Sequence, residues 1–308
     1  MFGKKSSGAI AGGLLLAVIL WGASNAGTKY VLRSWPPIWV GTTRFFFAGL
    51  IMLAILKWTR WFGVQHQMSP TLKRGLWLRG GLSLAVYIVA FNWAMQLTSA
   101  SHVALYLGTS PVWALVWEEG PSRIWRSAQR YGAALLATTG VMVLLWPVLK
   151  SGSMRLLGEL MGLIASFMWA HYGRQARLLT ATLSGAEVGA HTMWRAGLIL
   201  MPLALLEVVY RGGLACKPEL VVVQTYCLIG GGVLAYALWN NGLSHWPTSR
   251  VFLFNNLIPL TTMIWSNVCL GEPFSRTFWW AMLLIVAGVV LGQVSWQKIL
   301  GNRWVPME

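Results

Sequence analysis

The sequence predicts an all-α integral membrane protein whose ten transmembrane helices form two inverted five-helix repeats. Three observations predict this fold class. First, 56% of the 308 residues are hydrophobic and only 10% are charged, whereas about 25% of residues are charged in an ordinary soluble domain. Second, long apolar segments follow one another with short connections, and no soluble domain is left over. Third, the chain aligns with itself without gaps at an offset of 148 residues.

An apolar segment of about 20 residues crosses a bilayer as a helix. The first run could be mistaken for a signal peptide, but it continues to about residue 32, which is long enough to span. Each later run is bounded by a short polar loop. The ten expected spans are about 8–32, 37–57, 74–97, 99–118, 127–147, 156–178, 186–209, 221–244, 248–270 and 275–296.

The repeat is clearest between residues 91–111, "FNWAMQLTSASHVALYLGTSP", and residues 239–259, "WNNGLSHWPTSRVFLFNNLIP". The same offset places Trp21 on Trp169 and runs through all five spans of each half. Because five is an odd number, the second copy enters the membrane from the opposite side, as in the inverted repeats of many secondary transporters. We therefore expect one repeat over 1–148 and a second over 149–308.

The distribution of basic residues predicts the orientation in the membrane. Fifteen Lys and Arg residues lie in the termini and loops of one side, and seven lie on the other. The side with more positive charge is expected to be cytoplasmic. Both termini are then cytoplasmic, in a multi-pass protein of a bacterial inner membrane.

Composition and motifs exclude several classes of function. The net charge of +16 lies in short loops, where the orientation rule and anionic lipid headgroups explain it better than nucleic acid does. The chain contains no Asp, no phosphate-binding loop and only isolated cysteines, so no metal or cofactor is predicted. A membrane-embedded enzyme is the rival from another class, but no nucleophile–base pair or metal-binding motif supports it.

Polar and aromatic residues recur at helical spacing within the spans, so they share helix faces. Such faces are typical of a cavity in which amides and hydroxyls orient a small solute between aromatic walls. The candidate substrate-binding residues are Trp21, Asn25, Tyr87, Tyr106, Ser110, Trp169, Tyr172, Tyr236, Asn240 and Asn255.

Each of these residues also has a structural interpretation. Aromatic residues of membrane proteins often form belts at the membrane surface. Asn240 and its repeat mate Asn92 can cap a helix end or bridge two helices. The matched prolines Pro111 and Pro259 are predicted to kink helices and to act as hinges.

Ionisable residues inside spans are functional candidates by default. Arg44 and Arg195 lie about one turn from matched positions of the two repeats, and either could bind a substrate carboxylate. Alternatively, they extend toward the membrane surface or pair with Glu207 or Glu159. His102 and His171 could carry protons or simply pack. Lys29 and Arg177, matched by the offset at span ends, are expected to extend toward the surface.

The end of the second half, "LAYALWNNGLSHWPTSRVFLFNNLIPLTTMIWSNVCLGEPFS", together with ten spans in two halves, resembles the EamA-type transporters of the drug/metabolite transporter superfamily. The family pattern of a Pro, then Gly-Glu, then a Gly is met by Pro259, Gly271-Glu272 and Gly288. In the first half, Arg123-Ile124 stand where Gly-Glu would be. The resemblance implies a transporter of amino acids, other metabolites or drugs.

These observations lead to one interpretation. We expect a secondary transporter that exports small metabolites such as amino acids, by alternating access through a central cavity. A multidrug or toxic-cation exporter is the alternative within the same class. Its expected partners are the small-molecule substrate and membrane lipids, and a homodimer is also compatible with the sequence.

Overall fold

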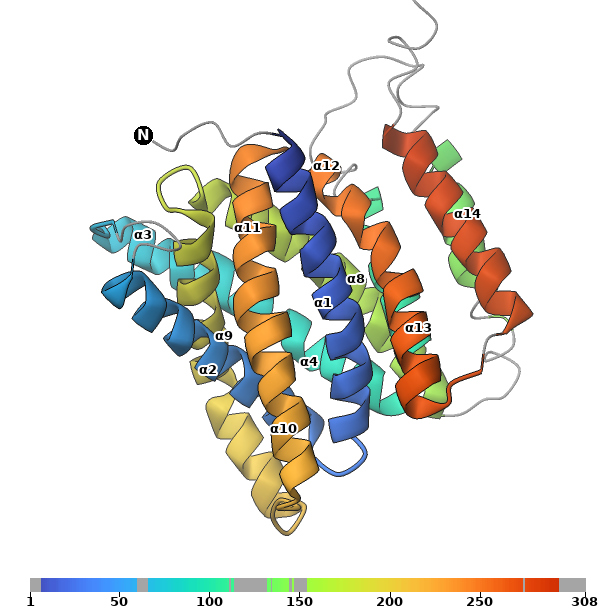
Figure 1. The fold of residues 1–308 in the computed structure, drawn as a ribbon, viewed down its shortest axis with the longest axis horizontal. Helices are drawn as coiled ribbons and strands as arrows, with labels where there is room; N and C mark the ends of the chain where they lie inside the picture. The colour runs from blue at the N-terminus through green and yellow to red at the C-terminus, as the bar shows by residue number, and fades with distance from the viewer. Residues whose placement is uncertain are drawn as a thin grey trace, which may run out of the picture.

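The computed structural model describes residues 7–59, 66–110, 112–113, 132–133, 135–143, 146, 154–273 and 275–293. Every secondary-structure element within these ranges is a helix. The long helices lie side by side in one bundle, with α14 at its edge (Figure 1).

In the first half, α1 (Ser7–Val31) is followed by α2 (Pro37–Trp58). Pro37 lies in the first turn of α2, where its missing N–H has no intrahelical partner to lose. The next rod is continuous but has three parts: α3 (Pro70–Gly75), a π-helical segment η1 (Leu76–Gly81) and α4 (Leu82–Leu97). The short α5 (Ala100–Leu107) follows, and residues 132–133 and 135–143 of this half are also helical.

The second half repeats this order. α8 (Met154–Leu179) and α9 (Gly185–Tyr210) precede a rod made of α10 (Pro218–Tyr226), the π-helical η2 (Cys227–Leu234) and α11 (Ala235–His245). The last elements are α12 (Thr248–Phe252), the 3₁₀-helical η3 (Leu253–Leu257), α13 (Ile258–Leu270) and α14 (Arg276–Gln293).

Five of the described helices are long and apolar enough to cross a membrane: Ser7–Val31, Pro37–Trp58, Pro70–Leu97, Gly185–Tyr210 and Pro218–His245. The expected span at 127–147 is described only at 132–133, 135–143 and 146, so the set of ten spans stays a prediction. The expected span at 248–270 is not one uninterrupted α-helix, because η3 breaks it before α13 begins. Pro259 lies in the first turn of α13, and Pro111 lies outside the described residues.

The contacts between helices occur in matched pairs. α1 packs against α11 and α13, while its counterpart α8 packs against α4 and α5. α2 and α9 pack directly on each other. In Figure 1 the chain descends from α3 to α4 but rises from α10 to α11, so these matched rods run in opposite directions.

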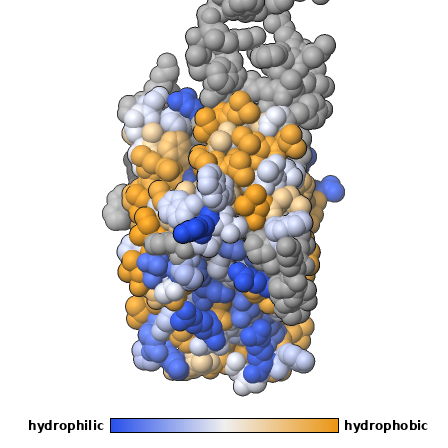
Figure 2. Space-filling view, turned by 90° about the vertical axis from the view of Figure 1, so that its right-hand side faces the viewer, coloured by the Kyte–Doolittle hydropathy of each residue, from blue (hydrophilic) through white to orange (hydrophobic). Residues whose placement is uncertain are grey.

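The outer surface of the bundle carries many large apolar side chains. Leu206, Val268 and Trp280 are each more than half exposed. Apolar residues dominate the upper part of the face in Figure 2, and polar residues gather toward its lower half. Exposed apolar side chains on this scale suit contact with lipid tails, because a soluble protein rarely exposes such large apolar patches.

Candidate functional site

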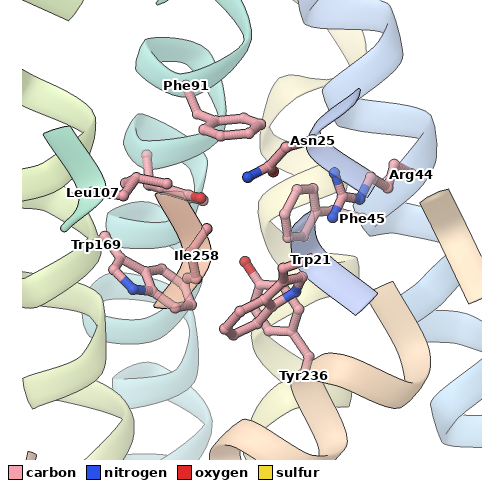
Figure 3. Close-up of a pocket in the computed structure, with 10 residues that line it drawn as sticks. Trp21, Asn25, Arg44, Phe45, Phe91, Leu107, Trp169, Tyr236 and Ile258 are labelled. Carbon is pink, nitrogen blue, oxygen red and sulfur yellow. The ribbon is translucent and has the colours of Figure 1, made fainter. Parts of the chain in front are cut away.

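The centre of the bundle contains a cavity to which seven helices of both halves contribute (Figure 3). The volume open to the centres of water molecules is only about 20 Å³, which is room for roughly one water molecule. A solute of amino-acid size does not fit this space, so the described conformation is closed and the helices must separate to admit one. The lining residues are Trp21, Asn25, Arg44, Phe45, Tyr87, Phe91, Leu107, Trp169, Tyr236 and Ile258.

Aromatic rings form most of the cavity wall. Trp21 and its repeat mate Trp169 meet edge to face, with ring centroids 5.4 Å apart and an interplanar angle of 85°. Tyr236 makes a similar edge contact with Trp21 at 5.4 Å. Each such pair contributes about 0.5–1.5 kcal/mol beyond the burial of its area. In Figure 3, Trp21, Trp169 and Tyr236 lie at one end of the cavity, opposite Phe91 and Asn25.

Hydrogen bonds set the orientation of two α1 side chains in this wall. Trp21 donates its indole Nε1–H to the carbonyl of Gly231, in the π-helical η2, at 2.8 Å. Asn25 donates from Nδ2 to Oγ1 of Thr262 on α13 at 3.0 Å. These contacts tie α1 to two helices of the other half, so the two halves meet at the cavity.

Arg44 brings a positive charge to the cavity. Its side chain is 4% exposed, Nη1 donates to Oγ1 of Thr28 at 3.2 Å, and the guanidinium lies 5.3 Å from the ring centroid of Phe45. No carboxylate among the described residues forms an ion pair with it, and its Nε has no hydrogen-bond partner there. A buried, uncompensated charge is costly, so a carboxylate bound beside Arg44 would remove part of that cost.

Six candidates from the sequence therefore meet at the cavity: Trp21, Asn25, Arg44, Tyr87, Trp169 and Tyr236. Tyr172 lies behind the wall. Its ring stacks on Trp169 with centroids 5.6 Å apart, and its hydroxyl hydrogen-bonds to Thr192 at 3.1 Å.

Tyr106, also a candidate, lies apart from the cavity. It is fully buried in a second apolar cluster, with Met263 of α13 and Phe278 and Ile285 of α14. Helical spacing predicted that Tyr106 and Ser110 share one face. α5 ends at Leu107 and the chain turns at Gly108, so the two residues do not lie on one continuous α-helix.

Ser110 and Asn255 contact each other: Asn255 donates from Nδ2 to Oγ of Ser110 at 2.7 Å. The offset of 148 residues maps this pair onto Ile258 and Leu107, and both of those residues line the cavity. The matched positions of the two repeats therefore carry a polar pair, Ser110 and Asn255, and an apolar pair, Leu107 and Ile258. Leu107 and Ile258 are apolar, so the pattern of polar residues does not single them out. The repeat offset, applied to Ser110 and Asn255, does identify them.

Asn240 and Arg195 are buried outside the cavity lining. A Cβ atom added to Gly189 of α9 would lie 2.8 Å from Nδ2 of Asn240, so this amide packs against α9. Arg195 lies over the rings of Trp77 and Trp194, 5.3 and 4.3 Å from their centroids, and donates from Nη1 to the carbonyl of His191 at 2.9 Å. Its charge thus already has local partners.

The remaining lining residues, Phe45 and Phe91, extend the aromatic wall. Phe91 stacks on Tyr87 with centroids 5.5 Å apart, one helical turn along α4, and the helical spacing places both residues on one face. Phe45 follows Arg44 and meets Tyr236 edge to face at 5.3 Å. Nothing in the sequence pattern singles out Phe45.

The comparison with known families agrees with this two-part construction. A family model described as "EamA-like transporter family" matches residues 8–146 and matches again over residues 156–292. The chain belongs to the EamA-like transporter family. This membership confirms the resemblance of the sequence, makes the protein a membrane transporter, and places it among transporters rather than enzymes.

Several of its relatives carry transporter names. The chain is 23% identical to an "Uncharacterized transporter" of Archaeoglobus fulgidus, over 90% of this chain and 95% of the relative. It is also 23% identical to a "Probable amino-acid metabolite efflux pump" of Escherichia coli, over 94% of both chains. A solved crystal structure is 19% identical, with a TM-score of 0.67, over 97% of this chain and all of the other, which shows a shared fold.

Proposed function

We propose that this protein exports small carboxylate-bearing metabolites, amino acids foremost, by alternating access through the cavity. The single observation that carries the proposal is Arg44, a buried cation in an aromatic cavity without a carboxylate partner among the described residues. The aromatic wall would contact an apolar side chain while Arg44 holds the carboxylate. The name of the Escherichia coli relative points to the same substrate class.

The proposal includes an arrangement in the membrane. The repeats 1–148 and 149–308, with ten spans in total, would rock against each other around the cavity. The double match of the family model and the opposite directions of the matched rods support two inverted repeats. Relatives named inner membrane transporters support a bacterial inner membrane, and the positive charges support cytoplasmic termini.

A toxic-cation exporter is the second candidate, because aromatic rings also attract cations. Six of the ten lining side chains are aromatic, and no carboxylate lines the cavity in the part of the chain that the structure describes. Arg44 weighs against this candidate, since a substrate with only a positive charge would be repelled.

The test is uptake of labelled amino acids and of lipophilic cations into proteoliposomes, with and without a pH gradient. Saturable uptake of an amino acid is expected. Arg44→Gln should weaken its apparent affinity about ten- to a hundredfold, because a hydrogen bond to a charged group contributes about 1.5–3 kcal/mol.

Arg195→Gln is the matched control, because Arg195 is as deeply buried but lies outside the cavity lining. Its protein should keep the parent's affinity, and size-exclusion chromatography would verify that both variants stay folded. Saturable transport of cations without transport of any carboxylate would reject the proposed substrate class.

A further inference from the structure

Lys29 at the end of α1 and Arg177 at the end of α8 make equivalent contacts, one in each half of the protein. Lys29 donates from Nζ to the carbonyls of Met95 and Thr98, at 2.6 and 2.7 Å. These carbonyls belong to the last turn and C-cap of α4, where backbone acceptors lack intrahelical partners. The Lys29 ammonium therefore points inward and closes the end of α4, instead of extending toward the membrane surface as expected.

Arg177 repeats this contact in the second half. It donates from Nη1 to the carbonyl of Leu243 at 2.8 Å and also to the carbonyl of Trp246. All three residues lie 148 positions after Lys29, Met95 and Thr98. A contact kept in both copies, on three matched positions, indicates a role that both halves need. Cations are favourable at helix C-termini, so each one holds the end of α1 or α8 to the end of α4 or α11.

The α4–α5 end carries a second charged contact. Gly271 adopts the left-handed conformation, with φ of 69°, and ends α13. The next residue, Glu272, accepts hydrogen bonds from the backbone N–H of Ala100 at 3.1 Å and from the hydroxyl of Ser101 at 3.0 Å. Its carboxylate thus holds the N-terminus of α5, where negative charge is stabilising.

A third contact strengthens the same end. Glu159 of α8 is fully buried and accepts from Oγ1 of Thr98 at 2.6 Å, and its Oε1 lies 2.9 Å from Nδ1 of His102. The α4–α5 junction is therefore held by Lys29 from α1, by Glu159 from α8 and by Glu272 from the segment after α13.

The α11–α12 end differs. The offset of 148 residues places Ile124 at the position of Glu272, and an isoleucine side chain accepts no hydrogen bond. Residue 124 itself lies outside the described residues. Besides Arg177, the described contacts near this end include the Arg250 guanidinium, 3.9 Å from the ring centroid of Trp246, and hydrogen bonds among Asn241, Ser244 and His245. Aromatic contacts link this end to the cavity wall. Trp239 and Phe252 meet with centroids 5.4 Å apart, and Trp239 lies 5.0 Å from Trp21 of the cavity wall.

The charged end lies next to the cavity. Asn25 lines the cavity one helical turn before Lys29, and Phe91 lines it one turn before Met95. Release of the Lys29 contact would therefore let α1 and α4 part beside the lining residues. Hydrogen bonds to charged groups are stronger than aromatic contacts.

We infer that Lys29 and Arg177 are positioning residues of two opposed gates, and that Glu272 makes the gate at the α4–α5 end the stronger one. The closed protein therefore opens more readily at the α11–α12 end. Only the biological role of this asymmetry rests on the proposed function. In the proposed orientation, the α11–α12 end faces the cytoplasm, where an exporter binds its substrate.

The test measures access to the cavity without any substrate. A reporter cysteine, Ile258→Cys, is placed in protein whose Cys216, Cys227 and Cys269 are changed to Ser. A membrane-impermeant maleimide is added to one face of oriented vesicles, and the rate of labelling is measured. The parent should be labelled faster from the α11–α12 face.

Glu272→Gln should raise the labelling rate from the α4–α5 face about tenfold, because a charged hydrogen-bond acceptor is lost. Arg177→Gln is the matched variant and should accelerate labelling from the opposite face only. Lys29→Gln should act like Glu272→Gln, whereas Lys29→Arg, which copies the second half, should keep the slow labelling of the parent.

Three outcomes would overturn the inference. The first is equal acceleration of labelling from both faces in every variant, which would indicate general loosening of the protein. The second is an unchanged labelling rate in Glu272→Gln. The third is a reporter cysteine that stays unlabelled in every variant. Because the readout is labelling, its result is separate from the transport assay: a failed amino-acid assay with one-sided labelling would reject the substrate class and leave the gates standing.

Discussion

Arg44 and Arg195 are both almost fully buried in long apolar helices, yet their surroundings differ. Arg44 faces the cavity and has a single hydroxyl partner, Thr28. Arg195 lies over two tryptophan rings and bonds within its own helix. The sequence singled out both arginines by the same argument, an ionisable group inside a span. Only the rotation of each helix in the bundle decides which guanidinium faces the cavity.

Trp21 provides a prediction at this scale. Trp21→Phe keeps an aromatic ring but removes the hydrogen bond to Gly231. Because a neutral hydrogen bond contributes about 1 kcal/mol, the apparent affinity for a transported amino acid should fall about fivefold, as measured by flux in proteoliposomes. Trp279→Phe, at a half-exposed tryptophan of α14, is the control. An unchanged affinity in Trp21→Phe would show that the ring alone matters.

At the scale of elements, the sequence predicts most helix boundaries well. The expected spans at 37–57 and 186–209 correspond to α2 and α9 within one residue at each end. The π-helical segments and the break at η3 were not predicted. The π-helical η1 packs against α9, and η2 packs against α1 and α2, so both segments lie at contacts between the two halves. Hydropathy measures only the length of an apolar run.

The contact between α2 and α9 depends on small residues. A Cβ atom added to Gly49 of α2 would meet the backbone nitrogen of Trp194 and lie 2.9 Å from the carbonyl oxygen of Ala190. Gly49→Ala should therefore destabilise the protein by about 1–3 kcal/mol and lower its melting temperature in detergent by several degrees. Gly12→Ala is the control, since no atom lies within 4 Å of an added Cβ there. Equal melting temperatures would contradict the close packing.

At the scale of the whole molecule, the repeat relates positions that lie far apart in the chain. Trp21 and Trp169 touch in the cavity wall, and the contacts of Lys29 recur at Arg177. The sequence showed these positions to be equivalent but did not show what they contact. The expectation that Lys29 and Arg177 extend toward the membrane surface was wrong, because the carbonyls at the ends of α4 and α11 lie within their reach.

Orientation is tested on the whole protein. Positive charges predict both termini in the cytoplasm, so a fluorescent protein fused to the C-terminus should fluoresce in a bacterial host. Alkaline phosphatase fused at the same place should stay inactive, because it matures only outside the cytoplasm. The opposite pattern would reverse the faces assigned to the two gates and would leave the cavity unchanged.

The sequence by itself determined the membrane class, the repeat offset, most helix boundaries and the family. Each of these depends on order along the chain: the length of apolar runs, the spacing of matched residues and the positions of turn residues. The tertiary structure alone decided which candidates meet at the cavity and which charges close its ends. Those choices depend on how each helix is rotated and where it crosses its neighbours, and side-chain packing between distant segments sets both.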